Sequence, residues 1–396
     1  MRKRIYRSCV VAIVTVAFAV SSVGQIPPAN SNPSRDPIHM LVLGDSIMWG
    51  QGLKESDKSW WRVKGWLKEK TGREVRERIE AHSGAAIEAE PGPDQAFKSR
   101  DGEVNLIWPT VNEQVDSAVS YYGDPSQVDL VLVNGCINDL GVRNLLDSST
   151  QLDSLSATIK EKCGARMERL LRTVTTTFRN AHVVVTNYYP IVSPMTGDIR
   201  FTRMLANKLL QKPETRKLSD SQLRERLATI SQLWYQVSTQ SLLAAVEAVG
   251  SDLRNELSAQ KILFAEIQFS PEHAFSAPDS LLWNFMFGST NLSGLRKAIV
   301  VLTFGTAAYK PNDEVRDRRN QSCKQTYKRP AGVKETKERK DHREDNYMAC
   351  RYASLGHPNK MGALIYTEAI KGQLHWLIQS AGWLRKPVNS QAIGPN

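Results

Sequence analysis

The stretch IHMLVLGDS, residues 38–46, decides the fold because a mainly apolar run ends directly in a glycine turn. The run from Ile38 to Leu43 has the length and composition of a buried strand. Gly44 permits a tight turn, and Ser46 then stands where a helix can begin. Serine is common at helix starts, and a serine on such a turn can also keep its hydroxyl exposed. The stretch therefore predicts a strand, a turn and a helix, with Ser46 as a candidate functional residue.

The same alternation continues outward from this stretch. Strands are predicted at 75–79, 128–133, 183–186 and 262–267, and helical patterns at 60–67, 155–178, 200–249 and 361–378. Strands that alternate with helices indicate a mostly parallel sheet covered on both faces. We therefore predict an α/β fold, a three-layer αβα arrangement of the flavodoxin-like kind. Reactive groups collect at the carboxyl ends of such strands, where Ser46 and the Asn138-Asp139 turn would lie.

Serine chemistry requires a specific set of neighbours. A hydroxyl becomes a good nucleophile only when a positioned base removes its proton, and the oxyanion that forms must meet donors already aimed at it. A nucleophilic Ser46 therefore needs a histidine and turns with hydrogen-bond donors close to it.

Four separated blocks of the sequence supply these groups. They are Gly44-Asp45-Ser46, His82-Ser83-Gly84-Ala85, Gly135-Cys136-Ile137-Asn138-Asp139 and His357-Pro358-Asn359-Lys360-Met361-Gly362. In content and order they resemble the blocks of the SGNH (GDSL-type) hydrolase family. The resemblance implies that Ser46 is the nucleophile and His357 the general base. It also implies an oxyanion hole made by the N–H groups of Ser46 and Gly84 with the Asn138 amide, and no need for a metal or cofactor.

The chain departs from the family pattern at two places. The family usually has one residue between the glycine and the asparagine of the third block, and here Cys136 and Ile137 both intervene. It also usually has an aspartate three residues before the histidine, where this chain has Ser354. A serine hydroxyl can orient an imidazole but cannot stabilise its cation as a carboxylate does. The backbone carbonyl of Ser354 is the first candidate for orienting His357, and Asp345 or Asp341 is the alternative.

The N-terminal sequence predicts an exported protein. Arg2, Lys3, Arg4 and Arg7 precede an apolar run and then small residues, which is the layout of a secretory signal peptide. We expect a signal at 1–24, a linker at 25–37, the hydrolase domain at 38–382 and a tail at 383–396. Insertions at about 200–250 (helical) and 305–350 (charged) would enlarge that domain and form a cap beside the cleft.

The charge of the chain is concentrated in one segment. Residues 310–351 hold 13 basic and 8 acidic residues, so this segment contributes +5 of the net charge of +11. Mixed-sign runs are usually solvated helices or loops. The alternative is a patch that contacts an anionic surface such as lipid headgroups or envelope polymers. Nucleic acid is not expected as a partner, because zinc-ligand spacing, RNA-binding aromatic patterns and a long basic arm are all missing from the sequence.

Four cysteines would remain after export. We predict a disulfide between Cys323 and Cys350, closing the charged segment at its base, and a free Cys136 beside the third block. Packing against the sheet is the preferred role for Trp49, Trp60, Trp61 and Trp66, with an acyl pocket as the alternative. His82, His273 and His342 are expected to be hydrogen-bonded or surface histidines rather than catalytic ones.

These expectations define a secreted or periplasmic serine esterase or lipase that hydrolyses a carboxylic ester. Its substrate would be a lipid, an acylated polysaccharide or a small ester. An SGNH-type O-acyltransferase would share every catalytic residue. A non-catalytic envelope-binding protein would keep the fold and lose the geometry, and Ser354 is the one feature that points in that direction.

Overall fold

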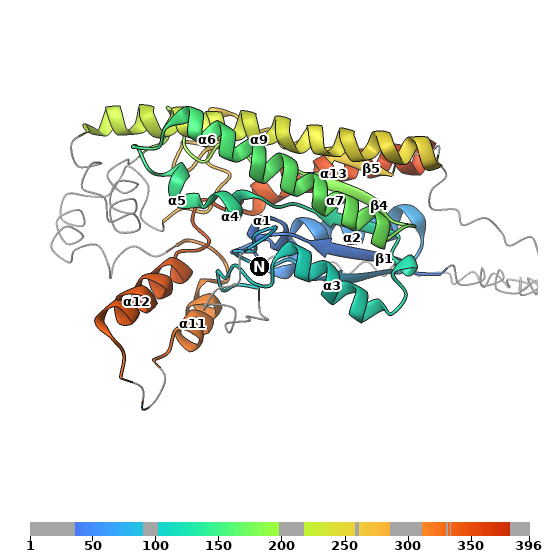
Figure 1. Ribbon diagram of the computed structural model, residues 1–396, viewed down its shortest axis with the longest axis horizontal. Coiled ribbons are helices and arrows are strands. Elements are labelled where there is room, and N and C mark those ends of the chain that lie inside the picture. The colour runs from blue at the N-terminus through green and yellow to red at the C-terminus, as the bar shows by residue number, and fades with distance from the viewer. Residues whose placement is uncertain are drawn as a thin grey trace, which may run out of the picture. The chain divides into compact units, whose positions relative to one another are not determined.

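The computed structural model describes residues 36–89, 102–197, 218–257, 261–285, 311–329, 332 and 334–380 (Figure 1). The predicted signal peptide at 1–24 and the tail at 383–396 lie outside these residues, as does almost all of the linker at 25–37. Within the described ranges, no helix combines the length and the apolar character that crossing a membrane requires.

Five parallel strands form one sheet in the order β2-β1-β3-β4-β5. The sheet consists of β1 (Ile38–Leu43), β2 (Val75–Ile79), β3 (Leu130–Val133), β4 (His182–Thr186) and β5 (Ile262–Ala265). All four pairings are parallel. This is the flavodoxin-like strand order, so the predicted fold class is confirmed.

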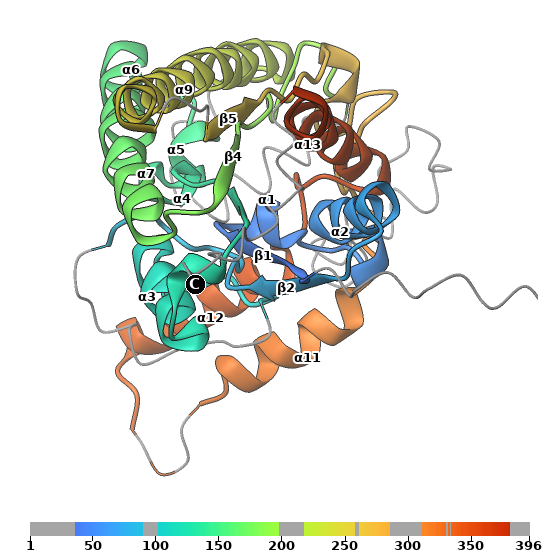
Figure 2. The ribbon, with the colours of Figure 1, turned by 90° about the vertical axis from the view of Figure 1, so that its right-hand side faces the viewer.

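Helices cover both faces of this sheet, and successive residues of β1 show why. Met40 and Val42 point into a cluster with α2 (Ser59–Thr71) and α13 (Lys360–Ser380). Leu41 and Leu43 point into a larger cluster on the other face, because side chains alternate along a strand. That face is covered by α3 (Val111–Tyr122), α6 (Leu152–Ile159), α7 (Arg166–Thr177) and α9 (Asp220–Leu257). Figure 2 shows α2 and α13 together on one side of the strands and α3 and α7 on the other.

Short helical turns lie close to the strand ends and connections. These are α1 (Ser46–Trp49), α4 (Ile137–Leu140), α5 (Val142–Leu145) and 3-10 turns at Glu55–Asp57, Pro125–Gln127 and Pro271–His273. Between α6 and α7 the chain forms a π-helical segment, Lys160–Ala165, so the helix predicted at 155–178 is one run with a π turn in its middle. Such turns insert an extra residue and often lie near functional sites.

The two predicted insertions have different structures. Of the helical insertion, 198–217 lies outside the described residues, and the rest is α9, a helix of 38 residues that packs on α6, α7 and β5. The charged segment forms two helices, α11 (Arg316–Thr326) and α12 (Lys337–Arg351), joined by a disulfide between Cys323 and Cys350. The predicted Cys323–Cys350 pairing is therefore confirmed. Both ribbon views show α11 and α12 side by side.

Candidate active site

The structure brings Ser46 and His357 into direct contact. Ser46 is the first residue of α1, immediately beyond β1, and His357 lies in the turn between α12 and α13. The His357 Nε2 atom is 2.7 Å from the Ser46 Oγ atom, although 311 positions separate the two residues. This distance is in the range from which a base can take a hydroxyl proton.

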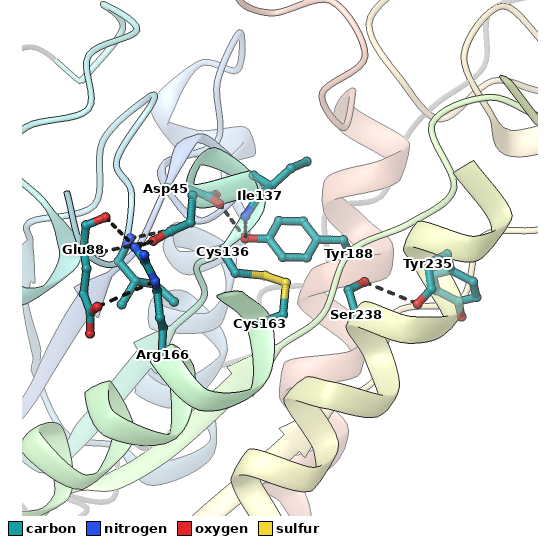
Figure 3. Close-up of a disulfide and its surroundings, with 11 residues drawn as sticks. Asp45, Glu88, Cys136, Ile137, Cys163, Arg166, Tyr188, Tyr235 and Ser238 are labelled. Atoms are coloured by element: carbon teal, nitrogen blue, oxygen red, sulfur yellow. Dashed lines mark hydrogen bonds and ion pairs between the residues drawn. A yellow bond between two sulfur atoms is a disulfide. The ribbon is translucent and has the colours of Figure 1, made fainter. Parts of the chain in front are cut away.

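Asp45 holds the turn that presents Ser46. Its carboxylate is fully buried and accepts hydrogen bonds from the Ile47 N–H (2.8 Å), the Asn134 amide (2.9 Å) and the Tyr188 hydroxyl (2.6 Å). Burial raises the pKa of Asp45, and the hydrogen bond from Tyr188 is the largest effect that opposes it. Gly44 has φ of +132° and leaves no space for a side chain, since a Cβ would lie 2.1 Å from the Asn134 Oδ1 atom. Figure 3 shows Asp45 and Tyr188 directed toward each other.

Backbone hydrogen bonds fix the turn that carries His357. The Trp283 N–H donates to the His357 carbonyl (2.7 Å), and the Gly356 N–H donates to the Trp283 carbonyl (3.0 Å). The Tyr189 hydroxyl donates to the Gly356 carbonyl at 2.7 Å. The backbone position of His357 is therefore fixed by hydrogen bonds from Trp283 and Tyr189.

The imidazole of His357 is neutral at physiological pH. Burial lowers its pKa to about 4, the backbone carbonyl of Leu355 raises it, and the Arg319 cation lowers it further. The Ser354 carbonyl and the Asp313 carboxylate have smaller raising effects. The Nδ1 atom is buried and forms no hydrogen bond of normal geometry with the described chain. The carbonyls therefore act on the ring by proximity, and a neutral ring has a free Nε2 lone pair for the Ser46 proton.

Ser354 uses both of its polar groups, but in other contacts. Its carbonyl accepts the backbone N–H of His357 at 3.0 Å, and its hydroxyl donates to the Asp313 Oδ2 atom at 2.7 Å. Asp341 and Asp345, the alternative partners, do not line the cleft that contains His357. The carboxylate that does influence the ring is Asp313, which sequence reasoning missed because no recognisable pattern surrounds it.

The three proposed oxyanion donors have different surroundings. Within the described chain, the N–H groups of Ser46 and Gly84 donate to no backbone or side-chain acceptor. The Asn138 amide lines the cleft and donates to the Ala85 carbonyl at 2.9 Å. Gly84 has φ of +87°, and a Cβ there would lie 2.4 Å from Asn105, another residue of the cleft.

Cys136 explains the extra residue before Asn138. It adopts φ of +111°, a conformation that favours glycine, and lies two positions before Asn138. Cys136 thus occupies the place where the family resemblance expects the glycine, and nothing is inserted. The prediction that Cys136 is free is wrong, because it forms a disulfide with Cys163 in the π-helical segment (Figure 3). The bond holds the backbone that presents Asn138 against the π-helical segment.

A cleft of about 270 Å³ opens beside Ser46, and we call it the Ser46 cleft. Polar groups lie at Ser46, His357, Asn105, Asn138, Arg143 and Asn346, and most of the remaining wall is apolar. The apolar wall is contributed by Ile47, Ile137, Val142, Leu146, Tyr189, Ile191, Val192, Phe275, Ala349, Tyr352, Ala353 and Leu355. The charged insertion therefore borders the cleft through α12 and its C-cap residue Tyr352. Among the described residues of the helical insertion, none lines the cleft.

The other sequence candidates pack elsewhere. None of the four tryptophans lines the Ser46 cleft, and all pack in the cluster around α2, which supports the packing role predicted for them. His82 bonds to the Pro109 carbonyl, His273 to Ser270 and His342 to Asn346.

Fold and site together define an α/β protein with a serine–histidine pair at the carboxyl edge of a parallel sheet. This arrangement agrees with the fold that the resemblance to the SGNH hydrolases implies. No family model matches the chain, and no curated protein matches it.

Similar solved structures include three named as lipases or esterases. An extracellular lipase from Streptomyces rimosus shares 14% identity over 62% of this chain and 87% of its own, with a TM-score of 0.37. Phospholipase A1 from Streptomyces albidoflavus shares 14% over 65% and 91%, with a TM-score of 0.33. A family 3 carbohydrate esterase from Clostridium thermocellum shares 15% over 62% and 86%, with a TM-score of 0.31.

Proposed function

We propose that this protein is an exported serine esterase that hydrolyses a carboxylic ester, with Ser46 as nucleophile and His357 as general base. The observation that carries the proposal is the 2.7 Å contact between the Ser46 Oγ and the His357 Nε2 atoms. A neutral imidazole at this distance, beside a cleft with unpaired N–H donors, is the arrangement that acyl transfer requires.

The reaction follows from these positions. His357 Nε2 takes the hydroxyl proton while the Ser46 Oγ bonds to the ester carbonyl carbon. The carbonyl oxygen becomes an oxyanion that accepts from the Ser46 and Gly84 N–H groups and the Asn138 amide. Collapse of this intermediate breaks the bond to the alcohol, which takes the proton from His357. Water then attacks the acyl-enzyme by the same route and releases the acid.

Stabilising the imidazolium is the demanding part of this mechanism. A carboxylate on Nδ1 would stabilise that cation, whereas here the nearest groups are the Leu355 and Ser354 carbonyls. Carbonyl dipoles orient the ring and stabilise its charge more weakly. We therefore propose a serine–histidine dyad rather than a triad.

The lining of the Ser46 cleft supports an aliphatic acyl group as its occupant. Val142 of α5 and Ala349 of α12 are among the apolar residues that line it, and binding an apolar chain there removes its surface from water. Arg143 and Asn346 are the polar groups of the wall contributed by these two helices. The substrate proposed is an ester of a short to medium fatty acid, whether its alcohol belongs to a lipid, a polysaccharide or a small molecule.

A panel of nitrophenyl esters of increasing chain length tests this function directly. We expect hydrolysis of several members, and His357→Ala should reduce it to background. Addition of glycerol or sugar acceptors separates hydrolysis from O-acyl transfer, because a transferase would produce new esters in their presence. Failure to cleave any ester or to form any new one would leave the non-catalytic binding protein as the better description.

Export is proposed from the N-terminal sequence and is supported by the disulfides at Cys136–Cys163 and Cys323–Cys350. Disulfides persist in oxidising compartments and are rare in the cytosol of most organisms. The anionic-surface role of 310–351 remains a proposal. Its helices hold ion pairs within the segment, including Arg343–Glu335 and Lys340–Glu344, which is typical of a solvated helical hairpin.

A further inference from the structure

A buried charge network lies directly behind the turn that carries His357. Asp313 and Arg319 have side chains with no exposed surface and form a two-pronged ion pair, with N–O distances of 2.8 and 2.7 Å. The Ser354 hydroxyl donates to the same carboxylate at 2.7 Å, and Ser354 is also fully buried. Arg319 in addition donates to the Arg351 carbonyl at the end of α12 (3.3 Å).

This network reaches the catalytic turn through one residue. Ser354 connects to Asp313 by its side chain and to the His357 backbone N–H by its carbonyl. The turn 354–357 is therefore held at one end by a buried carboxylate and at the other by the hydrogen bonds of Trp283 and Tyr189. Because Nδ1 has no hydrogen-bond partner among the described residues, the orientation of the ring depends on this backbone frame and on the Nε2 contact with Ser46.

We propose that Asp313 is a positioning residue for His357 that acts through the Ser354 hydroxyl. In this arrangement a carboxylate acts on the imidazole indirectly, through Ser354, instead of bonding to the ring itself. This inference rests on the esterase function proposed above. Arg319 holds the carboxylate in place with two hydrogen bonds, and a buried carboxylate needs such a partner to be stable.

The effect of this network on the ring is therefore geometric. A salt bridge that only joined α11 to the rest of the chain would not reach the catalytic turn, whereas this one does, because the Ser354 hydroxyl bonds to its carboxylate and the Ser354 carbonyl accepts the His357 N–H.

Ser354→Ala tests the geometric effect without disturbing the ion pair. It removes one hydroxyl and leaves Asp313 bonded to Arg319, so the variant should fold. We expect kcat per folded molecule to fall by about 10- to 10²-fold with KM within about twofold, the size of effect that misplacing a catalytic group produces. Ser354→Thr keeps the hydroxyl and should recover most of this loss.

Asp313→Asn/Arg319→Gln removes the ion pair while avoiding an unpaired buried charge. Because the Ser354 hydroxyl then loses its fixed, charged acceptor, kcat should fall in the same direction as in Ser354→Ala, with KM within about twofold. Glu335→Gln is the matched control, because it breaks a two-pronged ion pair with Arg343 in the same hairpin but touches neither Ser354 nor Asp313. Its kcat should equal that of the unaltered protein.

The readout separates this inference from the function on which it rests. Esterase activity of the unaltered protein, normalised to the amount of folded enzyme, establishes the function. A folded Ser354→Ala variant with kcat within about twofold of the unaltered protein would overturn the positioning role while leaving the function intact. An unchanged kcat in the double variant would likewise show that the ion pair does not position the turn.

Discussion

The imidazole of His357 titrates at an unusually low pH for a catalytic base. Its pKa of about 4 lies well below the ordinary value of 6.5, chiefly because of burial. His357 acts as a base only when it is neutral. We therefore expect kcat/KM to rise as the pH passes the pKa of His357 in the folded protein, and then to stay level up to neutral pH.

We therefore predict that the acidic limb of kcat/KM has its midpoint near pH 4 rather than near 6.5. The measurement is a pH–rate profile with a neutral ester, with folding monitored at each pH. A limb at or above pH 6.5 would show that a carboxylate pairs with the ring, contrary to the dyad.

Asn138 is the oxyanion donor that can be removed by substitution. Asn138→Ala should lower kcat by roughly 10²–10³-fold with little change in stability, the usual cost of one lost donor. Asn346→Ala is the matched control, since Asn346 lines the same cleft from α12 and should leave kcat nearly unchanged. Equal, small effects of both substitutions would make Asn138 a structural residue only.

Single functional residues could be predicted from the sequence where they lie in a recognisable motif, and could not where they lie outside one. Ser46 and His357 could be selected because each follows a recognisable block, and the structure places them in contact. Asp313 could not, because it lies 41 residues before its partner Ser354 and depends on how α11 folds back. The disulfide of Cys136 could not be predicted either, because its partner Cys163 lies in a π turn that no local pattern reveals.

The Cys136–Cys163 disulfide joins α4 to the π-helical segment and holds an unfavourable backbone conformation. Removing it should lower the free energy of unfolding by about 3–4 kcal/mol, given the 27 residues that separate the cysteines. Because φ is positive at Cys136, glycine should suit that position better than alanine.

We predict that Cys136→Gly/Cys163→Ala is more stable than Cys136→Ala/Cys163→Ala by about 1 kcal/mol. Cys136→Ala/Cys163→Gly should be the least stable, since glycine weakens a helix interior by about 1 kcal/mol. Denaturant unfolding of the three variants measures the order. The reverse order would mean that the backbone at residue 136 relaxes once the bond is gone.

Helix α12 and the residues directly after it, Tyr352 and Ala353, form one wall of the Ser46 cleft, so this wall should set the acyl-chain preference. Ala353→Trp fills this side of the cleft and should shift the preferred nitrophenyl ester to shorter chains, with acetate hydrolysis retained. Ala244→Trp on the exposed face of α9 is the control and should change nothing. An unchanged chain-length profile in Ala353→Trp would place the acyl group elsewhere.

Elements in the sheet could be predicted well, and those in the insertions less so. β1, β3 and β4 are mainly apolar or β-branched runs, and they lie close to the predicted positions. The segment 310–351 has almost no apolar periodicity. Its helices are held by a disulfide and by the buried Asp313–Arg319 pair rather than by a broad hydrophobic face.

At the scale of the whole molecule, the parallel sheet brings the blocks together. β1 delivers Ser46 and β3 leads to Asn138, and adjacent parallel strands end at the same edge. His357 reaches that edge only after the charged insertion, through the turn before α13. The order of blocks along the chain therefore predicted the site, while the distance between them reflects insertions whose arrangement depends on tertiary contacts.

The central claim is that Ser46 is a nucleophile activated by His357. Labelling the purified protein with a fluorophosphonate and mapping the adduct by mass spectrometry tests it most directly. The account predicts a single adduct on Ser46, absent in Ser46→Ala and formed much more slowly in His357→Ala. An adduct on a different serine, or undiminished esterase activity in Ser46→Ala, would contradict it.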